Sequence, residues 1–262
     1  MPWIEANGVS LHYHLDGPDE GEPLVLVHEL GGTSFSWEPL IPTITEAGFR
    51  VLRWDWRGAG LSEKIRGDLS ADTMCGDLAA LMDAQDFARP VNLVGTALGG
   101  GIAVAFAARY PGLVKKLVAS SPATGGDNAS RDMLLTRADG VEREGMRPFA
   151  DPSLARSFPE KYRTDAGFFA TYRNRWICND PASFASHNRM LANMNEDENY
   201  AKITARTLVL SGVDDPLRTP AAVKEIADRI PGSEYRELET SHFLPITSPN
   251  LWTETVLPFI AP

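Results

Sequence analysis

Short apolar runs alternate along the chain with longer segments of helical periodicity. Several of these runs are almost continuously apolar, as at 24–27 and 207–210. Strands that are buried on both faces have this pattern, which is typical of a mostly parallel sheet. The predicted strands cover residues 9–15, 24–28, 50–55, 91–95, 114–120, 206–212 and 234–238.

Helical patterns separate these strands. They cover residues 70–85, 98–110 and 219–230, and a last one extends from about 248 to 260. Ser70 and Thr219 are candidate N-caps of the helices that follow them. The alternation predicts the α/β fold class, with a mostly parallel sheet flanked by helices.

The alternation stops between residues 124 and 203. No convincing strand is found there, and pieces such as 130–143 and 180–194 are amphipathic at helical spacing. We therefore expect 124–203 to form a helical cap inserted over the carboxyl edge of the sheet. Residues 1–123 and 204–262 are then the first and second parts of one α/β core.

The strongest local motif lies where the fourth predicted strand passes into a helix. Gly95 and Gly99 bracket position 97, as in the G-x-S-x-G pattern of a nucleophile elbow. Position 97 is alanine, and a methyl group cannot attack a carbonyl. Thr96 does not replace it, because a neighbouring residue in the turn points elsewhere. Taken alone, the stretch also fits a glycine-rich turn before a helix.

Candidate catalytic residues follow other predicted strands, and their order along the chain is informative. A Gly-containing loop follows residue 27, Asp214 and Asp215 follow the strand that ends near 212, and His242 follows the last strand. Elbow, acid and histidine thus occur in the chain order of the α/β-hydrolase triad.

On these motifs the chain resembles the α/β-hydrolase superfamily over nearly its whole length. The loop 28–32 is similar to the HGxGG oxyanion loop, 55–62 to the D-x-R-G-x-G-x-S turn, and 212–220 to the G-x-x-D-x-x-x-x-P segment. Within the superfamily, four segments resemble the 3-oxoadipate enol-lactonase group: 37–41, 120–123, 142–146 and 242–249.

The resemblance implies the α/β-hydrolase fold and the scaffold of a serine hydrolase that cleaves a small ester or lactone through an acyl-enzyme. Ala97 would occupy the nucleophile position, and His242 would act as general base. Asp215 would orient His242. It is preferred to Asp214 because the family motif has its acid three residues after the glycine.

Two backbone groups complete the implied machinery. The N–H groups of Leu30 and Leu98 would form the oxyanion hole. Such donors contribute roughly 10²–10³ to the rate.

Ala97 leaves several interpretations open. We favour an inactivating serine-to-alanine change made by engineering, with turnover nearly absent and binding retained. A natural pseudo-hydrolase that only binds a ligand is an alternative. So is an enzyme of the lyase or cofactor-free oxygenase type, in which the pair His242 and Asp215 acts as a base without a serine.

Glu29 is a second departure, because the family usually has glycine there. Our first interpretation is that it faces solvent or pairs with an arginine, and the alternative is a residue that contacts substrate or acts as an acid or base. Trp176 and Phe243 are further candidate substrate contacts, although aromatic residues of 124–203 also suit a core of their own. One or two arginines of that segment could bind a substrate carboxylate.

Composition limits the partners. Lys and Arg total 25 against 35 Asp and Glu, and the net charge of −10 argues against nucleic acid as a partner. No window is apolar enough to span a membrane, and the first residues lack the pattern of a secretion signal. Cys75 and Cys178 suit reduced thiols in a cytoplasmic protein. We expect a small-molecule substrate and neither a metal nor a cofactor, and the oligomeric state stays open.

Overall fold

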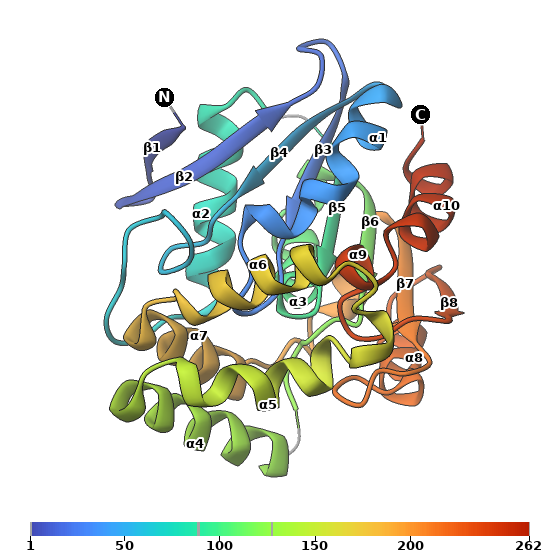
Figure 1. The fold of residues 1–262 in the computed structure, drawn as a ribbon. Coiled ribbons are helices and arrows are strands. Elements are labelled where there is room, and N and C mark those ends of the chain that lie inside the picture. The colour runs from blue at the N-terminus through green and yellow to red at the C-terminus, as the bar shows by residue number, and fades with distance from the viewer. Residues whose placement is uncertain (1, 88–89, 127, 262) are drawn as a thin grey trace.

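A computed structural model describes residues 2–87, 90–126 and 128–261 (Figure 1). Its centre is an eight-stranded sheet in the order β1-β2-β4-β3-β5-β6-β7-β8. Only the β1–β2 and β2–β4 pairs are antiparallel, so the predicted mostly parallel sheet is confirmed. The strands are β1 (Trp3–Ala6), β2 (Val9–Asp16), β3 (Glu22–Val27), β4 (Phe49–Trp54), β5 (Val91–Thr96), β6 (Val114–Ser120), β7 (Arg206–Gly212) and β8 (Glu234–Leu238).

Both faces of the sheet are covered by apolar layers. In β3, Leu24 and Leu26 face one layer while Val25 and Val27 face the other, because successive side chains of a strand point to opposite faces. The layer at Val25 contains α2 (Ala71–Ala84), α3 (Leu98–Arg109) and α8 (Pro220–Arg229). The opposite layer contains η1 (Ser34–Leu40), α1 (Ile41–Glu46), α9 (Leu244–Thr247) and α10 (Pro249–Ile260).

The predicted helix starts have the expected caps. The Ser70 hydroxyl accepts a hydrogen bond from the backbone N–H of Thr73 at 3.1 Å. The Thr219 hydroxyl accepts one from Ala222 at 3.4 Å, ahead of Pro220 at the first position of α8. These bonds satisfy N–H groups that have no partner inside the helix.

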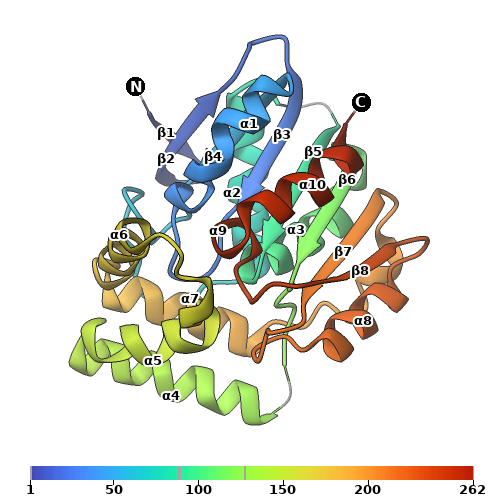
Figure 2. The same cartoon turned by 45° about the vertical axis from the view of Figure 1, so that its right-hand side comes forward.

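A group of helices connects β6 to β7. It contains α4 (Asn128–Glu144), α5 (Arg147–Ser157), α6 (Ala166–Ile177) and α7 (Pro181–Asn193), with short turns η3 (Glu160–Tyr162) and η4 (Tyr200–Lys202); η2 (Pro111–Leu113) precedes β6. Figures 1 and 2 show α4–α7 gathered below the sheet, at the end where the parallel strands finish. We call α4–α7 the helical insert.

Two further features bear on the sequence-based expectations. In the described part of the chain, no helix has the length and apolar content that a membrane crossing requires. Cys75 is buried, Cys178 is exposed, and both are free thiols.

Candidate active site

The turn between β5 and α3 has the backbone conformation of a nucleophile elbow. Ala97 has φ 53° and ψ −120°, which is unfavourable for a residue with a Cβ. Its carbonyl accepts hydrogen bonds from the N–H groups of Gly101 at 3.0 Å and Ala123 at 2.9 Å. The methyl group lines a cavity. The fold therefore holds position 97 in an unfavourable backbone conformation. An alanine side chain has no chemical use for this conformation.

The two glycines of the motif are required by close backbone approach. A Cβ at Gly95 would lie 2.3 Å from the Gly99 carbonyl oxygen, and one at Gly99 would lie 2.2 Å from that of His28. Neither distance is possible for a real side chain. Thr96 is buried and is not among the described residues that line the cavity.

A histidine and an aspartate meet beside this turn. His242 Nδ1 lies 2.7 Å from Asp215 Oδ2. The other carboxylate oxygen, Oδ1, accepts hydrogen bonds from the N–H groups of Leu217 at 2.8 Å and Arg218 at 2.9 Å. Burial acts to raise the pKa of Asp215, but the charge of His242 and these hydrogen bonds outweigh it and lower the pKa. Asp215 thus stays ionised and fixes the orientation of the His242 ring.

Asp214 has a different environment. Its carboxylate accepts a hydrogen bond from the Tyr162 hydroxyl at 2.6 Å and pairs with the Lys161 ammonium group. Both partners belong to the segment between α5 and α6. The hydrogen bonds from Lys161 and Tyr162 lower the pKa of Asp214. Of the two acids, Asp215 is the one in contact with His242, as the motif spacing predicts.

The backbone N–H groups of Leu30 and Leu98 are candidate donors to a negatively charged oxygen. Leu98 is the first residue of α3, and Leu30 lies in the loop after β3. Neither N–H donates a hydrogen bond to any residue that the structure describes, and both residues line the same cavity as Ala97. Unpaired N–H groups beside position 97 are the donors that an oxyanion requires.

The loop that carries Leu30 is fixed from two sides. His28 Nδ1 donates to the Glu29 carbonyl at 2.8 Å, and its Nε2 accepts from the Trp56 N–H at 3.3 Å. Burial lowers the pKa of His28, which suits this neutral form. Beyond the C-terminus of α6, the Asn179 amide donates to the Gly31 carbonyl at 2.9 Å. The helical insert therefore contacts the oxyanion loop directly.

The expectation that Glu29 faces solvent or pairs with an arginine is wrong. Glu29 is 1% exposed, and its Oε1 accepts hydrogen bonds from the Ser36 hydroxyl at 2.6 Å and the Tyr172 hydroxyl at 2.7 Å. It is also not among the described residues that line the cavity, so the alternative of a substrate contact is not supported either. Burial and then the charge of Glu29 raise the pKa of Tyr172 well above its usual value.

We predict that Tyr172→Phe lowers the free energy of unfolding by about 1.5–3 kcal/mol, because it removes a donor from a buried carboxylate. Urea denaturation at pH 7 measures the change. Tyr162→Phe is the matched control, since its partner Asp214 is partly exposed whereas Glu29 is buried, and we expect a smaller change. Equal effects of the two substitutions would contradict a special role for the Glu29 contact.

The D-x-R-G-x-G-x-S turn, residues 55–62, is hydrogen-bonded to the end of the oxyanion loop. Asp55 is buried and accepts hydrogen bonds from the N–H groups of Ser34 and Leu61, both at 2.8 Å, and lies 3.1 Å from His12 Nδ1. Burial acts to raise its pKa, but the His12 contact and the two backbone donors outweigh burial and lower the pKa far below the usual value. Ser34 follows the oxyanion loop, so Asp55 fixes the end of that loop.

This environment makes the effect of Asp55→Asn depend on pH. The pKa of Asp55 is lower in the folded than in the unfolded chain, so its stabilisation is complete above the unfolded value of about 4 and is lost as the pH falls towards the folded value. We expect Asp55→Asn to cost roughly 3 kcal/mol at pH 7 and progressively less from pH 5 to pH 3. Urea midpoints of parent and variant across this range give the difference. A difference that stays constant down to pH 3 would rule out this account.

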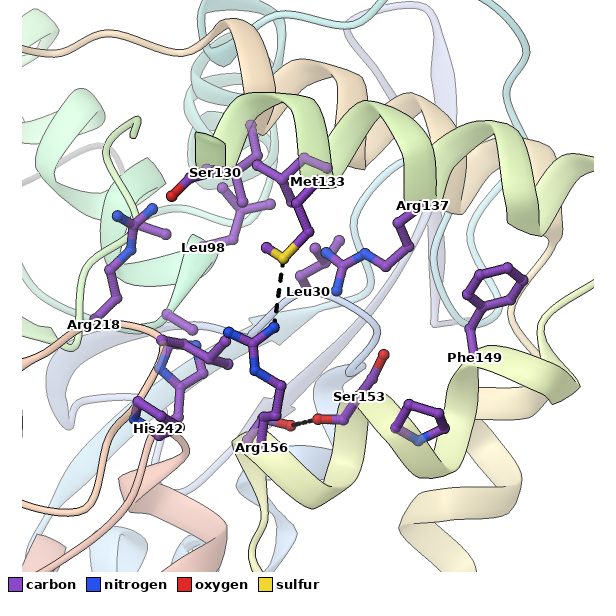
Figure 3. Close-up of a pocket in the computed structure, with 18 of the residues that line it drawn as sticks. Leu30, Leu98, Ser130, Met133, Arg137, Phe149, Ser153, Arg156, Arg218 and His242 are labelled. Carbon is purple, nitrogen blue, oxygen red and sulfur yellow. Dashed lines mark hydrogen bonds between the residues drawn. The ribbon is translucent and has the colours of Figure 1, made fainter. Parts of the chain in front are cut away.

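The cavity beside Ala97 has a volume of about 550 Å³ (Figure 3). Trp176 and Phe243 line it, as expected of substrate contacts, together with His242. Phe149, Arg137 and Arg156 of the insert also line it, in agreement with the expectation that some aromatic residues and arginines of this segment reach a pocket. Other lining residues carried no signal in the sequence, because a helical pattern does not say which face meets a cavity; the main ones are Met133, Leu134, Ser153, Phe184 and Arg218.

Comparisons with known proteins agree with this geometry. The family described as serine aminopeptidase, S33 (Hydrolase_4) matches residues 21–242. A putative carbamate hydrolase RutD from Variovorax paradoxus is 29% identical, with 97% of both chains covered. The 3-oxoadipate enol-lactonase 1 of Acinetobacter baylyi is 24% identical, with 97% of this chain and 94% of that protein covered.

A solved structure matches the whole chain. The enol-lactonase from Burkholderia xenovorans LB400 superposes with a TM-score of 0.94 at 31% identity, with 100% of both chains covered. The predicted resemblance to the α/β-hydrolase superfamily, with enol-lactonases among the relatives, is confirmed. The chain belongs to the serine aminopeptidase S33 (Hydrolase_4) family and has the α/β-hydrolase fold.

Proposed function

We propose that the chain is the scaffold of a serine hydrolase for a small ester or lactone, inactivated by alanine at the nucleophile position. One observation carries the proposal: His242, held by Asp215 at 2.7 Å, and the strained Ala97 turn line one cavity. A turn of this kind and an oriented histidine serve a nucleophile at position 97. The relatives' names, an enol-lactonase and a carbamate hydrolase, describe cleavage at a carbonyl group and support the same chemistry.

The reaction of the active form follows from these groups. A serine hydroxyl at position 97 attacks the carbonyl carbon of the substrate while His242 takes its proton. The C–O bond to the leaving alcohol then breaks, and that alcohol receives the proton from His242. Water, deprotonated by His242, next attacks the acyl-enzyme and releases the acid and the serine hydroxyl. For a lactone, the alcohol and the acid are two ends of one product.

The oxyanion hole has its role in both additions. Each addition places a negative charge on the former carbonyl oxygen. In the proposal, the N–H groups of Leu30 and Leu98 donate to that oxygen. The loop with Leu30 has to rearrange little for this, because Asp55 and Asn179 fix it.

The chemical class is tested by assaying the Ala97→Ser variant with matched methyl esters, lactones and amides of the same acyl groups. We expect hydrolysis of esters or lactones, with amides slower. Hydrolysis of amides alone would overturn the ester and lactone assignment. An activity present in the parent chain and unchanged by Ala97→Ser would instead support a base enzyme built on His242 and Asp215.

A further inference from the structure

Two arginines of the helical insert line the cavity and have no acidic partner among the residues that the structure describes. Figure 3 shows Arg137 on α4 and Arg156 on α5, with the Arg156 guanidinium directed toward the sulfur of Met133. Arg137 Nε donates to the amide oxygen of Asn188 at 2.7 Å, and Arg156 contacts the Met133 sulfur at 3.5 Å. No carboxylate of the described residues lies within ion-pair distance of either guanidinium. We call these two side chains the arginine pair.

Acidic side chains of the insert pair instead with arginines that lie outside the cavity. Other arginines of the insert are paired: Arg173 with Asp151 at 2.6 Å, and Arg189 with Asp139 at 2.7 Å and with Glu142 at 2.6 Å. The protein carries ten more acidic than basic side chains, so acids are abundant. Two positive charges left together in such a protein indicate that their counter-charge is brought by a ligand.

The environment of Arg137 supports the same conclusion. Burial, and after it the charge of Arg156, lowers the pKa of Arg137 to about 10, so the side chain is still charged at pH 7. Its guanidinium carbon lies 5.7 Å from the centre of the Phe184 ring, and Asn188 holds its Nε. The group is therefore held in place, while no residue in the described part of the chain accepts a hydrogen bond from its terminal nitrogens.

We propose that the substrate carries a carboxylate, which the arginine pair binds while the ester or lactone carbonyl lies between Ala97 and His242. The ligand class is a short carboxylic acid with a neutral ester at its far end. The same cavity is also lined by the apolar side chains of Leu30, Leu134 and Phe149, which suits a ligand with a hydrocarbon chain. The position of the ester rests on the proposed function, whereas carboxylate binding by the arginine pair does not.

The kinetic test uses the Ala97→Ser variant with monomethyl and dimethyl esters of linear dicarboxylic acids of four to eight carbons. The half-esters carry the carboxylate and the diesters lack it. We expect kcat/KM to favour the half-ester at one chain length by at least 10-fold. Adding Arg137→Gln should lower kcat/KM for that half-ester by roughly 10- to 100-fold, mainly through KM. The value for the diester should fall by less than the value for the half-ester, and circular dichroism of the variant checks that it is folded.

Arg131→Gln is the matched control. Arg131 also belongs to α4, but it is exposed, contacts Asn193 and Asp132, and is not among the described residues that line the cavity. We expect this variant to keep the preference for the half-ester. Arg156→Gln should behave as Arg137→Gln does, with a smaller loss, since Arg156 is more exposed.

A binding experiment tests the carboxylate site without hydrolysis. Calorimetric titration of the chain with Ala97 should show binding of the half-ester, weaker binding of the diester, and a 10-fold or greater loss with Arg137→Gln. Methyl phosphate in place of the half-ester tests whether any small anion suffices, and binding as tight as that of the half-ester would overturn the assignment to a carboxylate.

The two experiments separate the proposals. Half-ester binding that depends on Arg137, without hydrolysis by Ala97→Ser, keeps the carboxylate site and overturns the proposed function. Hydrolysis of half-esters and diesters at equal rates, unaffected by Arg137→Gln, keeps the function and overturns the carboxylate site. Neither binding nor hydrolysis of any of these esters would overturn both.

Discussion

The Ala97→Ser variant is expected to hydrolyse a matched ester or lactone with kcat/KM on the order of 10⁴–10⁶ above the parent chain. Removing the nucleophile from an intact triad costs about 10⁶, and this substitution reverses that loss. The expectation rests on three features that the parent already has: the strained turn at Ala97, the bond of 2.7 Å between His242 and Asp215, and the N–H groups of Leu30 and Leu98, which have no acceptor among the described residues. A hydroxyl adds one atom at the edge of an open cavity, so the fold should accept it.

The measurement compares initial rates of parent and variant on the same protein preparations. Ala97→Gly is the control, because glycine tolerates the positive φ of this turn but supplies no nucleophile. It should be as inactive as the parent and somewhat more stable. A rate for Ala97→Ser within 10-fold of the Ala97→Gly rate on every ester and lactone would contradict the expectation.

The second large effect concerns His242 and Asp215 in the Ala97→Ser background. There, His242→Ala should remove nearly the whole gain, at least about 10⁴-fold, because the serine loses its base. Asp215→Asn should cost about 10⁴-fold, since an amide no longer holds the ring in the required tautomer. Steady-state kinetics of the two double variants measure both losses.

The same substitutions in the parent chain distinguish the rival mechanism. With Ala97 in place, the hydrolysis rate should already be at background, and His242→Ala should leave it unchanged. A parent activity that His242→Ala abolishes would instead identify the His242–Asp215 pair as a base that works without a serine. Circular dichroism of each variant checks that the fold is retained.

Much of the core could be predicted because its strands are buried on both faces and so are continuously apolar. The strand at 114–120 and the one at 206–212 coincide with β6 and β7. β1 was not predicted, since it has four residues at the sheet edge and three of them are not fully buried. α5 contains Pro148 and Pro152, which weaken any helical pattern, and it too was not predicted.

The chemistry of the site was predictable where it follows from motif spacing. Glycines at 95 and 99 and an acid three residues after Gly212 are local patterns, and each one positions a backbone or a carboxylate at a strand end. Contacts between distant segments are not local. The bond of Glu29 to Tyr172 joins residues 143 positions apart, and the sequence alone suggested an exposed carboxylate.

The arginine pair could not be identified from the sequence for the same reason. The insert contains many arginines, and their spacing along α4 and α5 does not say which of them face the cavity. That depends on how α4 packs against α7 and α5 against α6, which is a tertiary property. The sequence predicted that one or two arginines could bind a carboxylate, and the structure points to Arg137 and Arg156 as those residues.

The most direct test of the central claim is covalent labelling of position 97. The Ala97→Ser variant is treated with a fluorophosphonate that modifies activated serines, and intact-protein and peptide mass spectra locate the adduct. The account predicts one adduct per chain, at position 97, absent from the parent chain and strongly slowed by adding His242→Ala. No adduct at position 97, or labelling confined to another residue such as Ser121, would contradict it.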